Sequence, residues 1–340
     1  CCGRIGAGRT MMGRTASGLL ISLATILMFL LVLEGAVRFV IDSGMQYDLE
    51  MWKYARQVKQ TAENPRLGHE HRPSTSAHLM GVDVVTNSRK LRDDPVAIEK
   101  PPGVQRILML GDSFTFGWGV AIENTVSHRL EATFERDGAR VEVINAGVGH
   151  YNTVMEVEYF LTEGRTFDPD VVVLNYFIND AEPVPAYGAA GMLARSSFAY
   201  VYLRSRLDVL FRQLAARRDW AGYYLGLYAD GAPGWVAVER SIDALAEYCR
   251  RNGIVLMIVA YPELRDLKNY RFTVVHERLA DVARRHGAVY VDLLDAVRGI
   301  EESRLWVTRP DPHPNALAHG KFADALYPKL GDVISAHDAK

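Results

Sequence analysis

The sequence predicts an α/β protein whose core is a doubly wound, parallel five-stranded sheet with helices on both faces. Five short apolar runs follow residue 104, and most of them are separated by helical patterns that end in charged residues and glycine. The runs cover residues 106–110, 141–148, 170–178, 253–261 and 288–294. Continuous apolar strands that alternate with helices are typical of a parallel sheet covered on both sides.

An apolar segment precedes this pattern. Residues 19–33 carry no charge, and the apolar character continues further, interrupted by Glu34 and Arg38. A bilayer span takes about 20 residues, so residues 17–41 suffice if this acid and base, four positions apart, pair with each other or reach the interface. We therefore expect a signal-anchor transmembrane helix at 17–41 after a cytoplasmic tail at 1–16. A cleaved signal peptide and a buried core helix are the alternatives.

The orientation of this helix follows from its surroundings. Arginines lie on both sides of it, so the positive-inside rule gives only a weak bias. A short tail followed by a large domain favours the N-terminus inside, which places the domain on the periplasmic side of a bacterial cytoplasmic membrane. The chain begins with cysteine, and Met11 or Met12 is an alternative start.

The rest of the chain divides into two parts. We expect a stem and a hairpin at 42–102, with a loop at residues 63–76, because that stretch is rich in proline, glycine and serine. The α/β domain follows at 103–340. An insertion at 181–234 interrupts its alternation, and is either a lid over a site or a set of extra helices packed on the sheet.

The net charge, the cysteines and the spacing of possible metal ligands argue against several classes of function. The net charge is −2, so no basic field indicates nucleic-acid binding. Three cysteines, Cys1, Cys2 and Cys249, do not form a disulfide framework, and Cys249 is expected to be a small buried apolar residue. Asp311 and His313 have no third ligand at a spacing suited to a metal. We expect no cofactor.

Polar residues follow the predicted strands where each strand ends. They are Asp112-Ser113, the glycine-rich turn from Asn145 to His150, Asn179-Asp180, and Asp311 with His313 in the segment after the fifth strand. Ligands of open parallel sheets bind outside the carboxyl ends of the strands, so these residues should share one edge. They supply a hydroxyl, backbone N–H groups, a carboxamide, a carboxylate and an imidazole, which is the inventory of an acyl-transfer site.

Local chemistry supports this grouping. Asp311 and His313 each precede a proline, which favours an extended, stiff backbone for both. Asn315 suits the N-cap of the closing helix. Asp112 is expected to hydrogen-bond across its turn, and His319 is expected on the surface of the closing helix.

Taken together, these motifs resemble the SGNH, or GDSL-type, hydrolase family over roughly residues 103–335. The residues that carry the resemblance are Gly111-Asp112-Ser113, the "NAGVGHYNT" turn, Asn179-Asp180, and Asp311 with His313. It implies the flavodoxin-like fold of that family, with Ser113 as nucleophile, His313 as general base and Asp311 as the acid that orients the base. The Ser113 N–H, the N–H of Gly149 or His150, and the Asn179 side chain would form the oxyanion hole.

Two further features depart from the family pattern. Phe177 stands where the third block usually has glycine, which would narrow the pocket. Asp311 lies two residues before His313, where three is more common in the family. The shorter spacing resembles members related to the alginate O-acetyltransferases.

We expect a membrane-anchored serine esterase that hydrolyses acyl or acetyl esters through an acyl-serine intermediate, on an envelope glycan or lipid. An O-acyltransferase acting on an envelope polysaccharide is the first alternative, since it would share the acyl-enzyme. A non-catalytic envelope scaffold with the same fold is the second. The sequence indicates no oligomeric state.

Overall fold

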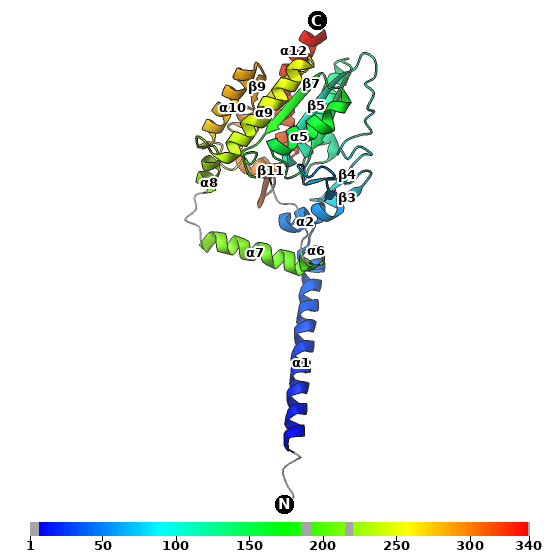
Figure 1. Ribbon diagram of the computed structural model, residues 1–340, viewed down its shortest axis with the longest axis vertical. Helices are drawn as coiled ribbons and strands as arrows, with labels where there is room; N and C mark the ends of the chain where they lie inside the picture. Colours follow the sequence, from blue (N-terminus) through cyan, green and yellow to red (C-terminus); the bar gives the residue numbers. More distant parts are fainter. Residues whose placement is uncertain (1–6, 185–191, 215–219, 339–340) are drawn as a thin grey trace, which may run out of the picture.

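A parallel five-stranded sheet forms the centre of the computed structural model, which describes residues 7–184, 192–214 and 220–338 (Figure 1). Its strands lie in the order β6-β5-β7-β8-β9. They are β5 (Gln105–Gly111), β6 (Val141–Gly147), β7 (Val171–Tyr176), β8 (Val255–Ala260) and β9 (Val289–Asp292). Each predicted strand is present, and the order reverses between β5 and β7, as in doubly wound sheets.

Helices cover both faces of the sheet, which confirms the predicted fold class. One face packs against α5 (Thr153–Thr162), α9 (Pro233–Arg251) and α10 (Thr273–His286), and the other against α4 (Val126–Arg136) and α12 (Ala316–Asp338). Along β5, Leu108 and Leu110 belong to the first core, whereas Ile107 and Met109 belong to the second. Alternate side chains of a strand point to opposite faces, so a strand buried on both sides must be apolar throughout.

The stem is built into the domain rather than separate from it. It contains α2 (Tyr47–Gln57), an antiparallel pair of β1 (Lys59–Thr61) and β2 (His69–His71), and a hairpin of β3 (Ser76–Leu79) and β4 (Val82–Val85). The predicted hairpin is present. The loop predicted at residues 63–76 was wrong in part, because β2 lies inside it with His69 and His71 buried.

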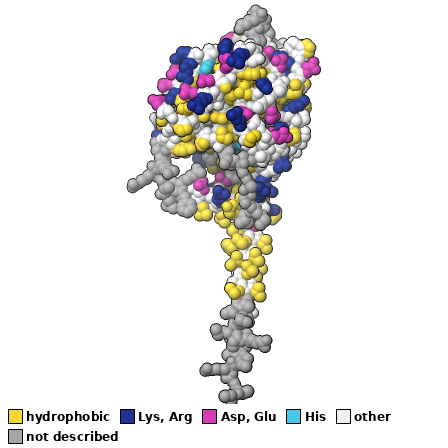
Figure 2. Space-filling view, in the orientation of Figure 1, with side chains coloured by type: hydrophobic (Ala, Val, Ile, Leu, Met, Phe, Trp, Pro, Cys, Tyr) yellow, Lys and Arg dark blue, Asp and Glu magenta, His cyan; other side chains and the backbone are white. Residues whose placement is uncertain are grey.

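Helix α1 (Ala7–Ala36) leaves the domain and continues into the short π-helix η1 (Val37–Ile41). Figure 2 shows hydrophobic side chains along its shaft. Residues Ser17–Ile41 contain an 18-residue stretch with a mean hydropathy of 2.4. The segment is long and apolar enough to cross a membrane, and is a candidate span or signal sequence. Arg38 Nη2 lies 3.0 Å from Glu34 Oε1, so the predicted pair is confirmed.

The insertion contributes three helices where the structure describes it; residues 185–191 and 215–219 of the predicted range lie outside the described residues. They are α6 (Met192–Ser196), α7 (Phe198–Leu214) and α8 (Trp220–Leu227). The remaining short elements are α3 (Ser113–Phe116), η2 (Ile122–Asn124), η3 (Gly164–Phe167), α11 (Leu294–Val297), η4 (Glu302–Arg304), β10 (Trp306–Thr308) and β11 (Asp311–Pro314).

Helix α12 closes the domain. Asn315 Oδ1 accepts the N–H groups of Leu317 at 3.0 Å and Ala318 at 3.2 Å, which confirms the predicted N-cap. The prediction for His319 was wrong: its side chain is fully buried, because α12 packs against α4 on that side.

Candidate active site

Ser113 is the first residue of α3, which begins directly at the end of β5. Asp112 caps this helix, and its Oδ1 accepts the Phe114 N–H at 2.8 Å, as expected for a turn residue. The neighbouring strand approaches closely: a Cβ at Gly147 would lie 2.2 Å from Phe116 N. Glycine at this position therefore lets the end of β6 support the backbone that presents Ser113.

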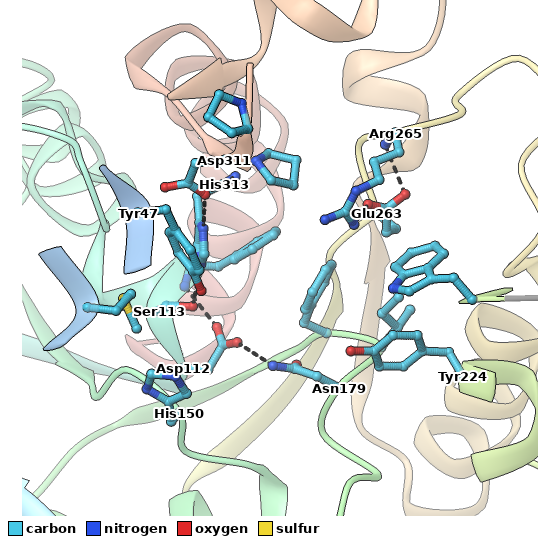
Figure 3. A pocket seen from close by; sticks show the side chains of 17 residues that line it. Tyr47, Asp112, Ser113, His150, Asn179, Tyr224, Glu263, Arg265, Asp311 and His313 are labelled. Carbon is cyan, nitrogen blue, oxygen red and sulfur yellow. Dashed lines mark hydrogen bonds and ion pairs between the residues drawn. The ribbon is translucent and has the colours of Figure 1, made fainter. Parts of the chain in front are cut away.

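Three of the predicted residues form a continuous hydrogen-bonded chain (Figure 3). Ser113 Oγ lies 2.9 Å from His313 Nε2, and His313 Nδ1 lies 2.5 Å from Asp311 Oδ1. Asp311 and His313 both belong to β11, so the extended backbone predicted from the prolines is present. This geometry gives a hydroxyl, a base within hydrogen-bond reach, and a carboxylate that orients the base.

Asp311 is held in its ionised form. Its second oxygen, Oδ2, accepts the indole N–H of Trp118 at 2.9 Å. Burial alone would raise the pKa of the Asp311 carboxyl, but hydrogen bonds from His313 and Trp118 hold it below its ordinary value. The carboxylate can therefore keep its charge at neutral pH while being only 1% exposed.

Aromatic rings enclose the imidazole of His313. Its ring centroid lies 5.8 Å from that of Tyr47, 5.5 Å from that of Phe114 and 6.3 Å from that of Trp118. These rings restrict the rotation of His313, so its Nε2 stays directed at Ser113. Neither Tyr47 nor Trp118 was predicted as part of the site, because their approach depends on tertiary packing.

Three residues that line the pocket, Ser113, His150 and Asn179, carry N–H donors. In the part of the chain that the structure describes, the backbone N–H groups of Ser113 and His150 donate to no acceptor. The Gly149 N–H instead donates to Tyr54 Oη at 3.1 Å. Asn179 Nδ2 donates to Asp112 Oδ2 at 3.3 Å, which leaves its second N–H available. Of the two turn amides considered, the one from His150 is therefore the uncommitted donor.

Lys59 lies behind this turn and was also not predicted. Its side chain is nearly fully buried, and Nζ donates to the Gly149 carbonyl at 2.5 Å. The same Nζ lies 3.0 Å from His69 Nε2 and 3.3 Å from His150 Nδ1. Burial holds the pKa of Lys59 well below its ordinary value. No ion pair formed by the described residues includes it.

A pocket of about 220 Å³ opens beside Ser113 and His313. Phe177 forms part of its wall and stacks on Phe114 with ring centroids 4.1 Å apart, so the residue in the glycine position does occupy space at the site. The far side is aromatic and polar, and is lined by Tyr224 of α8 with Glu263 and Arg265 (Figure 3). Trp220 of α8 also lines the pocket and stacks with Arg265.

The structure thus brings Ser113, Asp311, His313, His150 and Asn179 around one pocket. Gly149 lies behind it, with its N–H engaged by Tyr54. Within residues 7–184, 192–214 and 220–338, no group of three or more histidine, cysteine, aspartate or glutamate side chains could hold a metal ion.

Comparison with known proteins gives a family match. The model of the GDSL-like lipase/acylhydrolase family matches residues 109–321. No curated protein sequence matches the chain. Similar solved structures include TesA, at 13% identity over 67% of this chain and 99% of that chain, with a TM-score of 0.45. LAE5, an alpha/beta hydrolase enzyme from the metagenome of Lake Arreo, Spain, is 16% identical over 67% of this chain and 96% of its own, with a TM-score of 0.46. A catalytic mutant of Axe2, an acetylxylan esterase from Geobacillus stearothermophilus, is 14% identical over 67% of this chain and 94% of its own, with a TM-score of 0.45.

Proposed function

The chain belongs to the GDSL-like lipase/acylhydrolase family and is an ester-hydrolysing enzyme, and we propose on this premise that it works through an acyl-Ser113 intermediate. The observation that carries the proposal is the chain of contacts from Ser113 Oγ to His313 Nε2, at 2.9 Å, and from His313 Nδ1 to Asp311 Oδ1, at 2.5 Å. A serine hydroxyl becomes an effective nucleophile only when such a base accepts its proton.

In the proposed reaction, Ser113 Oγ attacks the carbonyl carbon of the ester while its proton passes to His313 Nε2. The resulting imidazolium is stabilised by the ionised Asp311. His313 then protonates the leaving alkoxide, the C–O bond to the alcohol breaks, and the acyl group remains on Ser113. A water molecule deprotonated by His313 attacks the acyl carbon in the second half, which releases the acid and restores the serine.

The developing negative charge on the carbonyl oxygen needs donors that are already in place. We assign the N–H groups of Ser113 and His150 and the Nδ2–H of Asn179 to this role. His150 is preferred to Gly149 because the Gly149 N–H already donates to Tyr54 Oη.

Asn179→Ala should lower kcat by about 10²- to 10³-fold with a small change in KM, as for loss of one oxyanion donor. Steady-state kinetics with p-nitrophenyl acetate would measure this. Asn252→Ala, at an exposed position at the end of α9, is the matched control and should leave kcat unchanged. Equal kcat for Asn179→Ala and the control would remove Asn179 from the oxyanion hole.

We also infer that Lys59 positions the oxyanion turn. The Gly149 carbonyl that accepts from Lys59 Nζ belongs to the same peptide group as the His150 N–H. A hydrogen bond to that carbonyl fixes the peptide plane and strengthens its N–H as a donor, because hydrogen-bonded groups polarise one another.

Lys59→Met should lower kcat roughly 10-fold and leave KM nearly unchanged, a modest loss for a group that acts on the donor rather than on the substrate. Lys59→Gln, which keeps an N–H donor, should lose less. The free energy of unfolding, measured in urea, should not fall in step with kcat, because removing a buried amine relieves its desolvation cost and so offsets the lost hydrogen bonds. A parallel loss of stability and kcat in both variants would make Lys59 a purely structural residue.

A fluorophosphonate probe tests the proposed nucleophile directly. Attack by Ser113 Oγ on phosphorus would form a covalent P–O bond and release fluoride, and mass spectrometry would locate the adduct. We expect labelling of the wild-type chain at Ser113 and none in Ser113→Ala. A folded wild-type protein that stays unlabelled would favour the non-catalytic scaffold.

The pocket also bears on the substrate. Its far side presents the Trp220 ring, with the Arg265 guanidinium 4.8 Å from the ring centroid, beside Glu263. An aromatic face flanked by charged groups suits the hydroxyl-rich alcohol part of a glycan ester better than an aliphatic chain. Because a sugar held there could also accept the acyl group, O-acyl transfer is the second candidate. Product analysis with a sugar acceptor distinguishes them, since a hydrolase releases only free acid.

We further propose that Ser17–Ile41 is an uncleaved signal anchor and that the α/β domain lies in the periplasm. The length and hydropathy of α1, and its extension away from the domain, support this assignment.

A further inference from the structure

Helix α7 lies crosswise over the domain-side end of α1 (Figure 1). The attachment is specific: Glu34 of α1 accepts hydrogen bonds from Ser197 Oγ at 2.8 Å and from the N–H groups of Phe198 and Ala199 at 3.0 and 2.9 Å. A carboxylate that caps the first turn of a helix satisfies N–H groups that lack a partner and interacts favourably with the helix dipole. The direction of α7 relative to α1 is therefore fixed.

The side of α7 that faces the domain is occupied. Ala199 is buried in a small apolar cluster with Val37 and Leu49. Arg206 pairs with Asp48 of α2, and α7 packs along that helix. One side of α7 is thus covered by the stem of the protein itself.

The adjoining side of α7 exposes apolar side chains. Tyr200, Leu203 and Leu207 are 37%, 42% and 51% exposed, and their spacing of three and four residues places them in one stripe. Arg204 lies beside them on the same exposed side. Asp208 lines the same hollow as Arg204, so this side presents an aromatic ring and two leucines beside one basic and one acidic side chain. Apolar side chains flanked by charged ones suit the boundary between acyl chains and lipid headgroups.

We propose that α7 lies in the membrane interface, with Tyr200, Leu203 and Leu207 inserted among the lipids, and that it holds the catalytic pocket against the bilayer. The proposal rests on the proposed signal anchor. The last turn of the candidate span, η1, also exposes apolar side chains: Phe39 and Val40 are 81% and 80% exposed. A helix fixed crosswise to a membrane span lies along the membrane plane, and in Figure 1 α7 lies at the end of the domain from which the span departs.

The position of the pocket gives this contact a consequence for substrate choice. Tyr47 follows the end of the candidate span by six residues, which reach at most ~20 Å. The ring of Tyr47 in turn lies against His313, with centroids 5.8 Å apart. In Figure 1, β11, α2 and α8 all lie at the end of the domain from which α1 departs. We therefore assign as substrate a glycan ester that is linked to a membrane lipid.

The first test measures the depth of α7 in the full chain reconstituted into phosphatidylcholine–phosphatidylglycerol vesicles. Leu203→Cys, labelled with bimane in a Cys1→Ser, Cys2→Ser background, is compared with Ala244→Cys, an exposed position on α9; Cys249 is buried and stays in place. Doxyl-labelled lipid should quench the probe at 203 at least about threefold more strongly than the probe at 244. Equal quenching would overturn the proposal. Shielding of the probe at 203 from aqueous iodide without quenching by lipid would do the same, since it would mean that a protein covers the stripe.

The second test separates this proposal from the proposed chemistry. Leu203→Glu combined with Leu207→Glu, in the full chain, should lower hydrolysis of an acyl ester embedded in the vesicles about 10-fold or more, because two carboxylates are costly in the interface. Hydrolysis of soluble p-nitrophenyl acetate should be unchanged, as should both activities in Ala244→Glu. Unchanged hydrolysis of the embedded ester would contradict the membrane contact. Failure of the wild-type chain to hydrolyse either ester would count against the acyl-Ser113 proposal, and lipid quenching at 203 would still decide the position of α7.

Discussion

Replacing Ser113 by alanine is expected to lower kcat by about 10⁴- to 10⁶-fold, which corresponds to about 5–8 kcal/mol of lost transition-state stabilisation. In the proposed mechanism the Oγ atom forms the bond to the acyl carbon, and its proton leaves through the contact with His313 Nε2 at 2.9 Å. Binding of the ester and the oxyanion donors would remain, so a residual rate above that of water is expected. Steady-state kinetics on p-nitrophenyl acetate would measure the loss.

Ser127→Ala is the matched control for this substitution. Ser127 is also buried and also hydrogen-bonded, to Thr125 Oγ1 and Asn145 Nδ2, but it does not line the pocket. Each substitution should change the free energy of unfolding by only about 1 kcal/mol, the usual net value of one hydrogen bond. The Ser127 variant should keep its kcat within a few-fold of wild type. A Ser113→Ala variant that keeps a tenth of the wild-type kcat would rule out Ser113 as the nucleophile.

The central sheet and the main contacts of the candidate site could be predicted because their signals are local in the sequence. Strands buried on both faces must be apolar throughout, so the ends of β5, β6 and β7 are visible as the points where polar residues return. Asp311 and His313 lie two residues apart on a backbone stiffened by prolines, so their mutual geometry is set by a few torsions. The position of Ser113 opposite them follows from the topology of a parallel sheet.

The residues that support this site could not be predicted, since they arrive by long-range packing. Tyr47 and Lys59 belong to the stem, yet they contact His313 and the Gly149 turn, which are far away along the chain. Trp118 lies among glycines and carries no sign that its indole N–H would reach Asp311. His319 shows the same limit, because a lone histidine in a helix gives no indication that a neighbouring helix covers it.

Asp311→Asn should lower kcat by about 10³- to 10⁴-fold, the scale of loss found when the acid of such a triad becomes an amide. The two carboxylate oxygens of Asp311 serve two different donors, His313 Nδ1–H and Trp118 Nε1–H. An asparagine has one acceptor oxygen, so its NH₂ group must face either the imidazole or the indole. If the NH₂ group faces the imidazole, Nδ1 of His313 must become the acceptor, and the ring proton moves to Nε2. A protonated Nε2 can no longer accept the proton of Ser113.

The expected effect of Asp311→Asn can be separated from a general loosening of β11 by Trp118→Phe. That variant removes the indole donor and leaves the carboxylate facing His313, so we expect a loss of only about 10-fold in kcat, consistent with an indirect contact.

The loss of kcat in Asp311→Asn should not depend on pH near neutrality. Because the pKa of Asp311 lies below its ordinary value, the wild-type carboxylate should stay ionised, and the ratio of the two kcat values should be constant between pH 6 and 8. Kinetics at several pH values would show this. A kcat within 10-fold of wild type throughout would mean that His313 needs no acid. Asp112 is not placed to take over, because His313 directs Nδ1 at Asp311 and Nε2 at Ser113, which leaves no ring nitrogen facing Asp112.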